Sequence, residues 1–264
     1  MFSPKDKATA CGMYSLTYFV ALFVTLSLVV LSLYLSRRAS QRTVRRIIAF
    51  LAAFSIGTEI VKMVFTGVTY GIEDVEFTPL YFCSLFMYAT PMALLPYKRI
   101  SDTGLAFLFF GGIVGAVAFF CYPSACIPNY PIYHFMCIRT MLYHGSMIYI
   151  GLLIVIRGYF KPSLSHFANY FIIISTVGAL AYLLNTYAGM GYDYMYISKP
   201  LDIAIVKAFY SLCPAIYPFV AILIQATIPF VISYCSYNLV MRILKKKTIN
   251  DFKEEPASIS FSER

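Results

Sequence analysis

Long apolar stretches separated by short polar ones dominate the chain. An α-helix needs about 20 apolar residues to cross the hydrocarbon core of a bilayer, and a window of that length finds seven candidates. They lie at roughly 14–36, 47–69, 79–96, 103–121, 136–156, 167–187 and 215–241. The pattern predicts an all-α membrane protein, a seven-transmembrane-helix bundle that forms a single domain over residues 1–241.

Two polar regions depart from this regular alternation. Between the sixth and seventh stretches, residues 189–200 read GMGYDYMYISKP, and the moderately apolar residues 201–210 follow. We expect 201–210 to lie as a short helix in the membrane interface. The basic segment 242–264 ends in EEPASISFSER and is expected to be a disordered cytoplasmic tail.

The composition supports a membrane protein and excludes two other classes. Hydrophobic residues make up 60% of the chain and charged residues 12%, about half the charged share of soluble domains. These values argue against a soluble globule and against a disordered chain. There are 23 Tyr and no Trp, so tyrosine is expected to supply the interfacial aromatic belt.

The net charge of +9 is distributed unevenly and predicts the topology. Fifteen Lys and Arg lie in alternate polar segments at 37–46, 98–99, 157–161 and 242–264, whereas four lie in the intervening ones. The positive-inside rule therefore places the N-terminus outside and the C-terminus in the cytoplasm, most naturally at the cell membrane. Because the charge is explained by topology, no nucleic-acid partner is expected.

Cysteine usage does not predict a disulfide framework. Five of the seven cysteines lie in or beside apolar stretches, and the odd number leaves at least one unpaired. A bridge between Cys121 and Cys126 stays open as a possibility. The first apolar stretch is too long for the apolar region of a cleavable signal peptide, so we expect it to remain as a helix.

Ionisable and polar residues inside the apolar stretches are few, and such residues usually face the interior of a bundle. Glu59 and Lys62 are three residues apart on one helical face and are expected to pair. At 1.5 Å per residue, Cys83 would lie about 6 Å from the outer surface and His144 about 12 Å. The polar residues expected in this outer half are Glu59, Lys62, Cys83, Arg139, His144 and Asn185. A shared depth predicts one polar cavity that opens toward the outer face.

Such a cavity would allow thiol chemistry. A thiolate attacks an acyl carbon, and His144 would take the proton of Cys83 and later return it. Lys62 or Arg139 would stabilise an oxyanion or bind a lipid phosphate. The alternative is that Cys83 is an ordinary buried thiol and that Glu59 and Lys62 form a salt bridge that locks the bundle.

Several other chemistries find no support in the sequence. There is no G-x-S-x-G segment, no H-E-x-x-H and no Cys/His spacing typical of a metal site, so no metal or cofactor is predicted. The seventh stretch lacks the lysine that a retinal protein would need. No internal repeat is visible, which weakens the case for a transporter.

Four segments resemble motifs of one known family. PLYFCSL (79–85) resembles P-L-H-L-C-D-L, and FFGGIVGAVAFFCYP (109–123) resembles a glycine-rich span that ends in a loop proline. MLYHGSMIYIGLLIV (141–155) resembles an F-x-x-H-G helix, and NTYAGMGYDYMYISKP (185–200) resembles N-x-x-x-G-x-N-Y-M-Y-L-x-x-K-P. In this order and spacing they look like the YwaF family of integral membrane proteins, related to the transmembrane protein 164 acyltransferases.

The resemblance implies a seven-helix bundle and, for the transmembrane protein 164 branch, acyl transfer onto lysophospholipids. The cysteine of that branch matches Cys83 and the family histidine matches His144. The last motif matches Asn185, Tyr194, Tyr196, Lys199 and Pro200. Three positions depart from the family pattern: Tyr81, Ser84 and Asp193.

We therefore expect a thiol-dependent phospholipid acyltransferase or transacylase whose partners are phospholipid, lysophospholipid and acyl chains. Cys83 would be the nucleophile, His144 the base, Asn185 an orienting group, and Lys62 or Arg139 the headgroup ligand. In the alternative hypothesis the same cavity, with Glu59, binds or transports a lipid or small solute without chemistry. The distance between the Cys83 sulfur and the His144 ring would help to discriminate the two.

Overall fold

The computed structural model describes residues 2–4, 9–187 and 193–254, with the side chains of 246–254 left out. Over these residues the chain is helical and contains no strand. The α-helices are α1 Leu16–Ser36, α2 Gln41–Tyr70, α3 Leu85–Met92, α4 Lys98–Ala106, α5 Gly112–Cys121, α6 Phe135–Ile156, α7 His166–Tyr187, α8 Ala204–Leu212 and α9 Tyr217–Glu254. Short 3₁₀ turns lie at Ile72–Asp74 and Tyr194–Tyr196.

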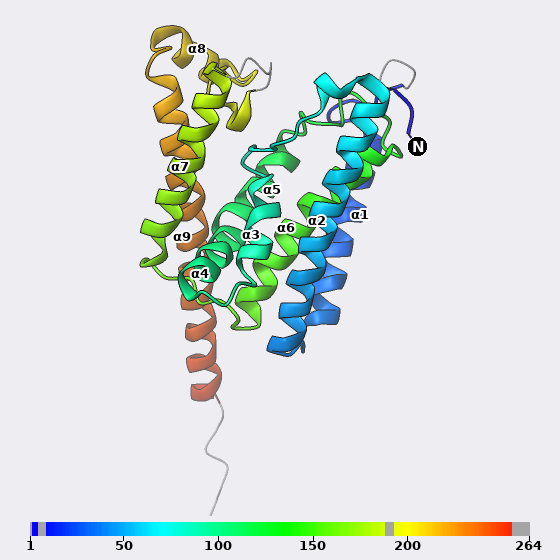
Figure 1. The fold of residues 1–264 in the computed structure, drawn as a ribbon. Coiled ribbons are helices and arrows are strands. Elements are labelled where there is room, and N and C mark those ends of the chain that lie inside the picture. Colours follow the sequence, from blue (N-terminus) through cyan, green and yellow to red (C-terminus); the bar gives the residue numbers. More distant parts are fainter. Residues whose placement is uncertain (1, 5–8, 188–192, 255–264) are drawn as a thin grey trace, which may run out of the picture.

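The helices form three groups side by side (Figure 1). One group holds α1, α2 and α6, the middle one holds α3, α4 and α5, and the last holds α7 and α9 with α8 at one end. The N-terminal residues lie at one end of the bundle and α9 ends at the opposite end. Among the described residues, six helical stretches are long and apolar enough to cross a membrane: α1, α2, Lys98–Cys121, α6, α7 and Tyr217–Lys245.

The third predicted span, 79–96, is not a membrane-length helix. Its helical part is α3, which has 8 residues and contains Pro91. Before it, the chain runs from the end of α2 into the bundle as turns and non-helical backbone, and then α3 continues in the same direction (Figure 1). Hydropathy predicted the apolar character of this segment correctly but not its conformation. We call residues 75–84 the inward segment.

A π-helix, Phe107–Gly111, joins α4 to α5 in one continuous stretch. Its aromatic side chains pack against the third group of helices: the rings of Phe110 and Phe230 lie 4.2 Å apart, and Tyr170 packs beside them. The Ser233 hydroxyl donates a hydrogen bond to the Phe110 carbonyl at 3.2 Å. These contacts bury the point where α5, α7 and α9 meet.

Close packing at glycine brings α3 against α4 and α6 against the π-helix. A Cβ at Gly104 would lie 2.6 Å from the Ala89 carbonyl oxygen, and one at Gly151 would lie 2.7 Å from the Leu108 carbonyl oxygen. Small residues let membrane helices approach in this way, because dispersion contacts rather than burial from water drive their association. A side chain at either position would push its helix away from the backbone of the neighbouring helix.

Both irregular regions contain helix. The segment expected as an interfacial helix at 201–210 overlaps α8, which begins three residues later and ends at Leu212, and none of the α8 residues is buried. Helix α9 continues to Glu254, so the segment predicted as a disordered tail is helical as far as that residue. The rest of that tail, 255–264, lies outside the described residues.

The base-rich loops meet at one end of the bundle. Arg157 donates to the Ala39 and Arg37 carbonyls at 2.8 Å and 2.7 Å, and Arg45 donates to the Leu94 carbonyl at 2.7 Å. These bonds satisfy carbonyl groups where helices end. The positive charge that predicts the topology therefore also ties the loops of that end together.

We predict that this end is cytoplasmic. A cysteine introduced at Arg38 should react with a membrane-impermeant thiol reagent only after the membrane is opened, and one at Glu73 should react in intact cells, because Lys and Arg are retained on the cytoplasmic side. Site-resolved mass spectrometry of the labelled chain measures both. Labelling of Arg38→Cys from outside would reverse the orientation.

At the end of the bundle opposite the base-rich loops, His134 anchors the N-terminal residues. Its Nδ1 accepts a hydrogen bond from the Met136 backbone N–H at 3.2 Å and so caps α6. An Nδ1 that accepts carries no proton, so Nε2 carries it and donates to the Ser3 carbonyl at 3.1 Å. The ring also stacks on Tyr130 with centroids 4.2 Å apart.

This contact is expected to depend on pH. Burial lowers the pKa of His134 below its ordinary value, because burial disfavours the imidazolium. A lowered histidine pKa stabilises the docked state fully above about pH 6.5 and progressively less as the pH falls through the folded-state pKa. Hydrogen exchange at the amides of Phe2 and Ser3, corrected for intrinsic rates, should be slower at pH 7.5 than at pH 5, and His134→Gln should abolish the difference. Equal protection at both pH values would contradict this role.

Candidate functional site

Cys83 lies in the turns immediately before α3, inside the bundle rather than at its surface. Its thiol donates to the Gly115 carbonyl on α5 with an Sγ to oxygen distance of 3.7 Å. Its own carbonyl accepts a hydrogen bond of 3.1 Å from the Tyr143 hydroxyl. Gly115 allows this approach, since a Cβ there would lie 3.5 Å from Sγ and 3.2 Å from the Phe82 ring.

Cys83 lies beside the middle of α6. Tyr143 lies eight residues after the first residue of α6, or about 12 Å along that helix, and its hydroxyl bonds the Cys83 carbonyl. The predicted depth of about 6 Å assumed a helix from Pro79 onward, whereas the chain before α3 is irregular and forms turns at residues 81–84.

His144 is buried on α6 and has a defined tautomer. Its Nδ1 lies 2.8 Å from the Thr140 carbonyl, and a carbonyl can only accept, so Nδ1 carries the proton. Nε2 therefore holds a lone pair and is the basic nitrogen of the ring. The ring stacks face to face on Phe119, with centroids 3.8 Å apart and planes at 14°.

Cys83 and His144 lie against neighbouring turns of α5. Cys83 contacts Gly115 and His144 contacts Phe119, which are four residues or about 6 Å apart along that helix. No hydrogen bond joins the two residues in the described part of the chain. The structure thus brings both sequence candidates to one face of α5 without direct pairing.

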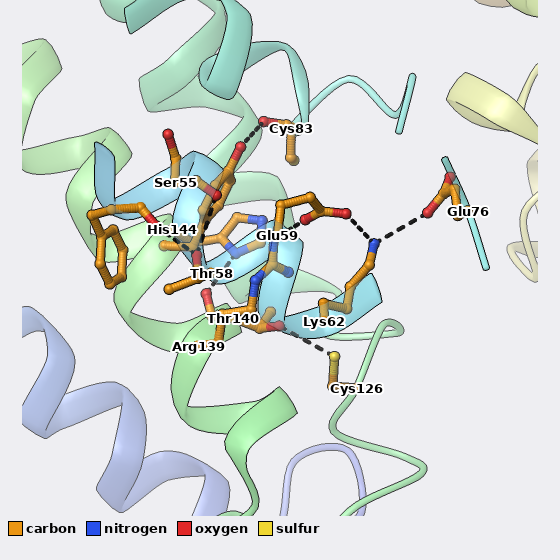
Figure 2. A network of polar contacts seen from close by, with 12 residues as sticks. Ser55, Thr58, Glu59, Lys62, Glu76, Cys83, Cys126, Arg139, Thr140 and His144 are labelled. Atoms are coloured by element: carbon orange, nitrogen blue, oxygen red, sulfur yellow. Dashed lines mark hydrogen bonds and ion pairs between the residues drawn. The ribbon is translucent and has the colours of Figure 1, made fainter. Parts of the chain in front are cut away.

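Four charged side chains form a buried network beside His144 (Figure 2). The Glu59 carboxylate lies between two cations: Lys62 Nζ is 2.5 Å from Oε1, and Arg139 pairs with Oε2. Lys62 also pairs with Glu76 at 3.2 Å. The predicted Glu59–Lys62 pair is confirmed, and two acids balance two bases within the bundle.

This network extends to the backbone of Cys83. The Arg139 guanidinium lies over the Tyr143 ring at 5.3 Å, and the Tyr143 hydroxyl holds the Cys83 carbonyl. Both cations that the sequence offered as oxyanion or headgroup ligands are already paired with carboxylates. Their direct role in the structure is to join α2 to α6 and to the inward segment.

Asn185 does not contact Cys83 or His144. Its side-chain nitrogen donates to Asp193, the Tyr194 carbonyl and Ser198 at 2.9 Å, 3.1 Å and 2.9 Å. Its side-chain oxygen accepts from the Tyr194 N–H at 2.8 Å. Among the described residues, the amide that was expected to orient a catalytic group is occupied by the loop that follows α7.

The aromatic motif residues lie over the inward segment. The Tyr81 ring is 5.2 Å from Tyr196 and 5.9 Å from Tyr194. Partial burial raises the pKa of Tyr196 to about 12, and Cys83 and Glu76 are among the groups that add to this rise. Lys199 is exposed and contributes its backbone N–H to Asp193 at 2.9 Å.

Residues that the sequence did not single out complete the surroundings. Thr140 holds His144 with its carbonyl and Cys126 with its hydroxyl, at an Sγ to oxygen distance of 3.2 Å. Helical spacing could have revealed these contacts from the sequence. Arg139 and Tyr143 are four residues apart on α6, and so are Thr140 and His144. Glu76 has no such signal, because it reaches Lys62 from non-helical backbone.

All seven cysteines are free thiols, so the possible Cys121–Cys126 bridge does not form. Cys126 instead faces Thr140 on α6. Over the described residues, no three His, Cys, Asp or Glu side chains lie close enough together to hold a metal ion.

The fold and the buried polar groups define a polytopic helical membrane protein with a thiol and an imidazole on one internal helix face. The chain belongs to the TMEM164 family, whose family model matches residues 12–234. No curated protein and no solved structure matches the chain.

The charge network predicts an asymmetric response to mutation. Glu59→Gln should lower the free energy of unfolding by on the order of 3 kcal/mol, because it leaves Arg139 buried without a counter-charge. The double variant Glu59→Gln, Arg139→Met should recover part of that loss. Thermal unfolding of the detergent-solubilised variants measures both. A double variant less stable than Glu59→Gln would show that Arg139 has another counter-charge.

Proposed function

We propose that the chain is a thiol-dependent phospholipid acyltransferase or transacylase, with Cys83 as nucleophile and His144 as base. The substrates are a phospholipid that gives an acyl chain and a lysophospholipid that receives it, and the cell membrane is the proposed location. Membership in the TMEM164 family and the placement of both residues on one face of α5 support this proposal.

The observation that carries the proposal is the tautomer of His144. With Nδ1–H committed to the Thr140 carbonyl, the free lone pair of the ring is on Nε2. A fixed tautomer on a ring clamped by Phe119 is what general-base catalysis requires, since the base must not rotate or exchange its proton between nitrogens.

The proposed reaction has two balanced halves. The Cys83 thiol gives its proton to His144 Nε2, and the sulfur attacks the ester carbonyl of the donor lipid. The carbon–oxygen bond breaks, His144 protonates the leaving lysolipid oxygen, and a thioester stays on Cys83. The hydroxyl of the acceptor then attacks the thioester while His144 takes its proton and returns it to the sulfur.

The charged side chains have a supporting role in this proposal. Because Glu59 and Glu76 together neutralise Lys62 and Arg139, neither cation is a free phosphate ligand in the structure. Arg139 instead fixes Tyr143, which holds the Cys83 carbonyl. The network thereby keeps the peptide that carries the nucleophile in place.

One observation favours a second function, the binding or transport of a lipid or small solute without chemistry. The Cys83 thiol is directed at the Gly115 carbonyl and not at His144. In this alternative Cys83 packs the cavity, and the charged groups recognise the ligand.

If Cys83 and His144 act together in catalysis, the loss of either one should lower acyl transfer to a similar extent. In vesicles that contain labelled phospholipid and lysophospholipid, Cys83→Ser and His144→Ala should each lower acyl transfer by roughly 100-fold or more. The double variant should be little worse than either single one, because paired catalytic groups act as a unit. A hydroxylamine-sensitive thioester should form on Cys83, as seen by mass spectrometry.

Two variants serve as controls. Cys121→Ser changes an exposed thiol at the end of α5, and His166→Ala changes the histidine that bonds Ser163 at the start of α7, so both should keep activity. Full function in Cys83→Ala, together with loss in Arg139→Met, would reject the enzyme and leave the binding function.

A further inference from the structure

The inward segment carries Cys83 into the bundle without the support of regular structure. Over residues 76–80 no backbone group makes a hydrogen bond in the described chain. Irregular backbone at membrane depth persists only where protein encloses it or where it lines a cavity. Something other than backbone pairing must hold this stretch.

Side-chain contacts hold the outer part of the inward segment in place. Val75 is buried against α2 at Gly67, where a Cβ would lie 3.1 Å from a Val75 methyl. Next to it, Glu76 pairs with Lys62 on the same helix through Oε2. Leu80 is buried further along. The pair with Lys62 is the one ion pair of the described inward segment.

Glu76 is an unusual group to place here. Its side chain is only 9% exposed, and its second oxygen, Oε1, is buried without a hydrogen-bond partner. Burial raises the pKa of Glu76, and the Lys62 ammonium opposes that rise. A buried charge of this kind adds little net stability, so its presence calls for another explanation.

We propose that Glu76 is a positioning residue: its ion pair with Lys62 fixes the inward segment on α2 and thereby sets how far the Cys83 thiol is open to the outer face. The inference concerns access to Cys83 and stands whether or not that thiol carries an acyl group.

The connection to Cys83 is mechanical. Glu76 and Cys83 are seven positions apart, and the chain makes no backbone hydrogen bond from residue 76 to residue 80 that could absorb a shift. At the far end Cys83 is held by Gly115 and by Tyr143. Loss of the ion pair at Glu76 leaves only apolar contacts at the outer end of the segment and so makes opening at Cys83 easier.

The chain offers variants that separate this role from stability. Glu76→Gln alone leaves the network with an unbalanced positive charge, which by itself lowers stability. The decisive variant is therefore the double Glu76→Gln, Lys62→Met. It keeps the Glu59–Arg139 pair and a neutral network. Glu73→Gln is the matched control, because Glu73 is exposed in the same loop.

The readout is the alkylation rate of each cysteine by N-ethylmaleimide, measured by mass spectrometry on the full chain in lipid nanodiscs. Cys121, which is exposed at the end of α5, serves as the internal reference. Relative to it, Cys83 should react roughly tenfold faster in Glu76→Gln, Lys62→Met than in the wild type, with thermal unfolding little changed. Glu73→Gln should leave the Cys83 rate as it is.

Two results would overturn the proposal. The first is an unchanged Cys83 rate in the folded double variant, which would mean that Gly115 and Tyr143 alone hold the thiol. The second is an equal acceleration in Glu73→Gln, which would mean that any loss of negative charge in the loop has the same effect.

Discussion

The pairing of charge inside the membrane is the constraint on which the rest of the structure depends. A carboxylate at this depth must find cations, and Glu59 finds two, Lys62 on its own helix and Arg139 on α6. The ion pair between Glu59 on α2 and Arg139 on α6 fixes how these two helices are rotated relative to each other. It also places Tyr143 and His144, which follow Arg139 by about one turn, toward the inward segment and α5.

The inward segment is subject to a constraint of the same kind. Its residues 76–80 make no backbone hydrogen bond in the described chain, so this backbone has to be enclosed by neighbouring helices. The bundle supplies that enclosure through α2, α5 and the loop that Asn185 holds.

Much of this architecture could be read from the sequence, because apolar length and helical spacing are local properties. Six apolar stretches and the Glu59–Lys62 pair needed no tertiary information. The irregular conformation around Cys83 and the partners of Asn185 could not be read in this way. Both depend on where irregular backbone runs, and neither Glu76 nor Asp193 reveals its partner through spacing.

The π-helix at Phe107–Gly111 has a geometric consequence for the face of α5 that meets Cys83 and His144. One residue added to a helical turn advances the following helix by about 100° around its axis. Without that extra residue, Gly115 and Phe119 would point to a different side of the bundle. The single widened turn that precedes α5 therefore sets the direction in which Gly115 and Phe119 face, and with it the positions of their contacts to Cys83 and His144.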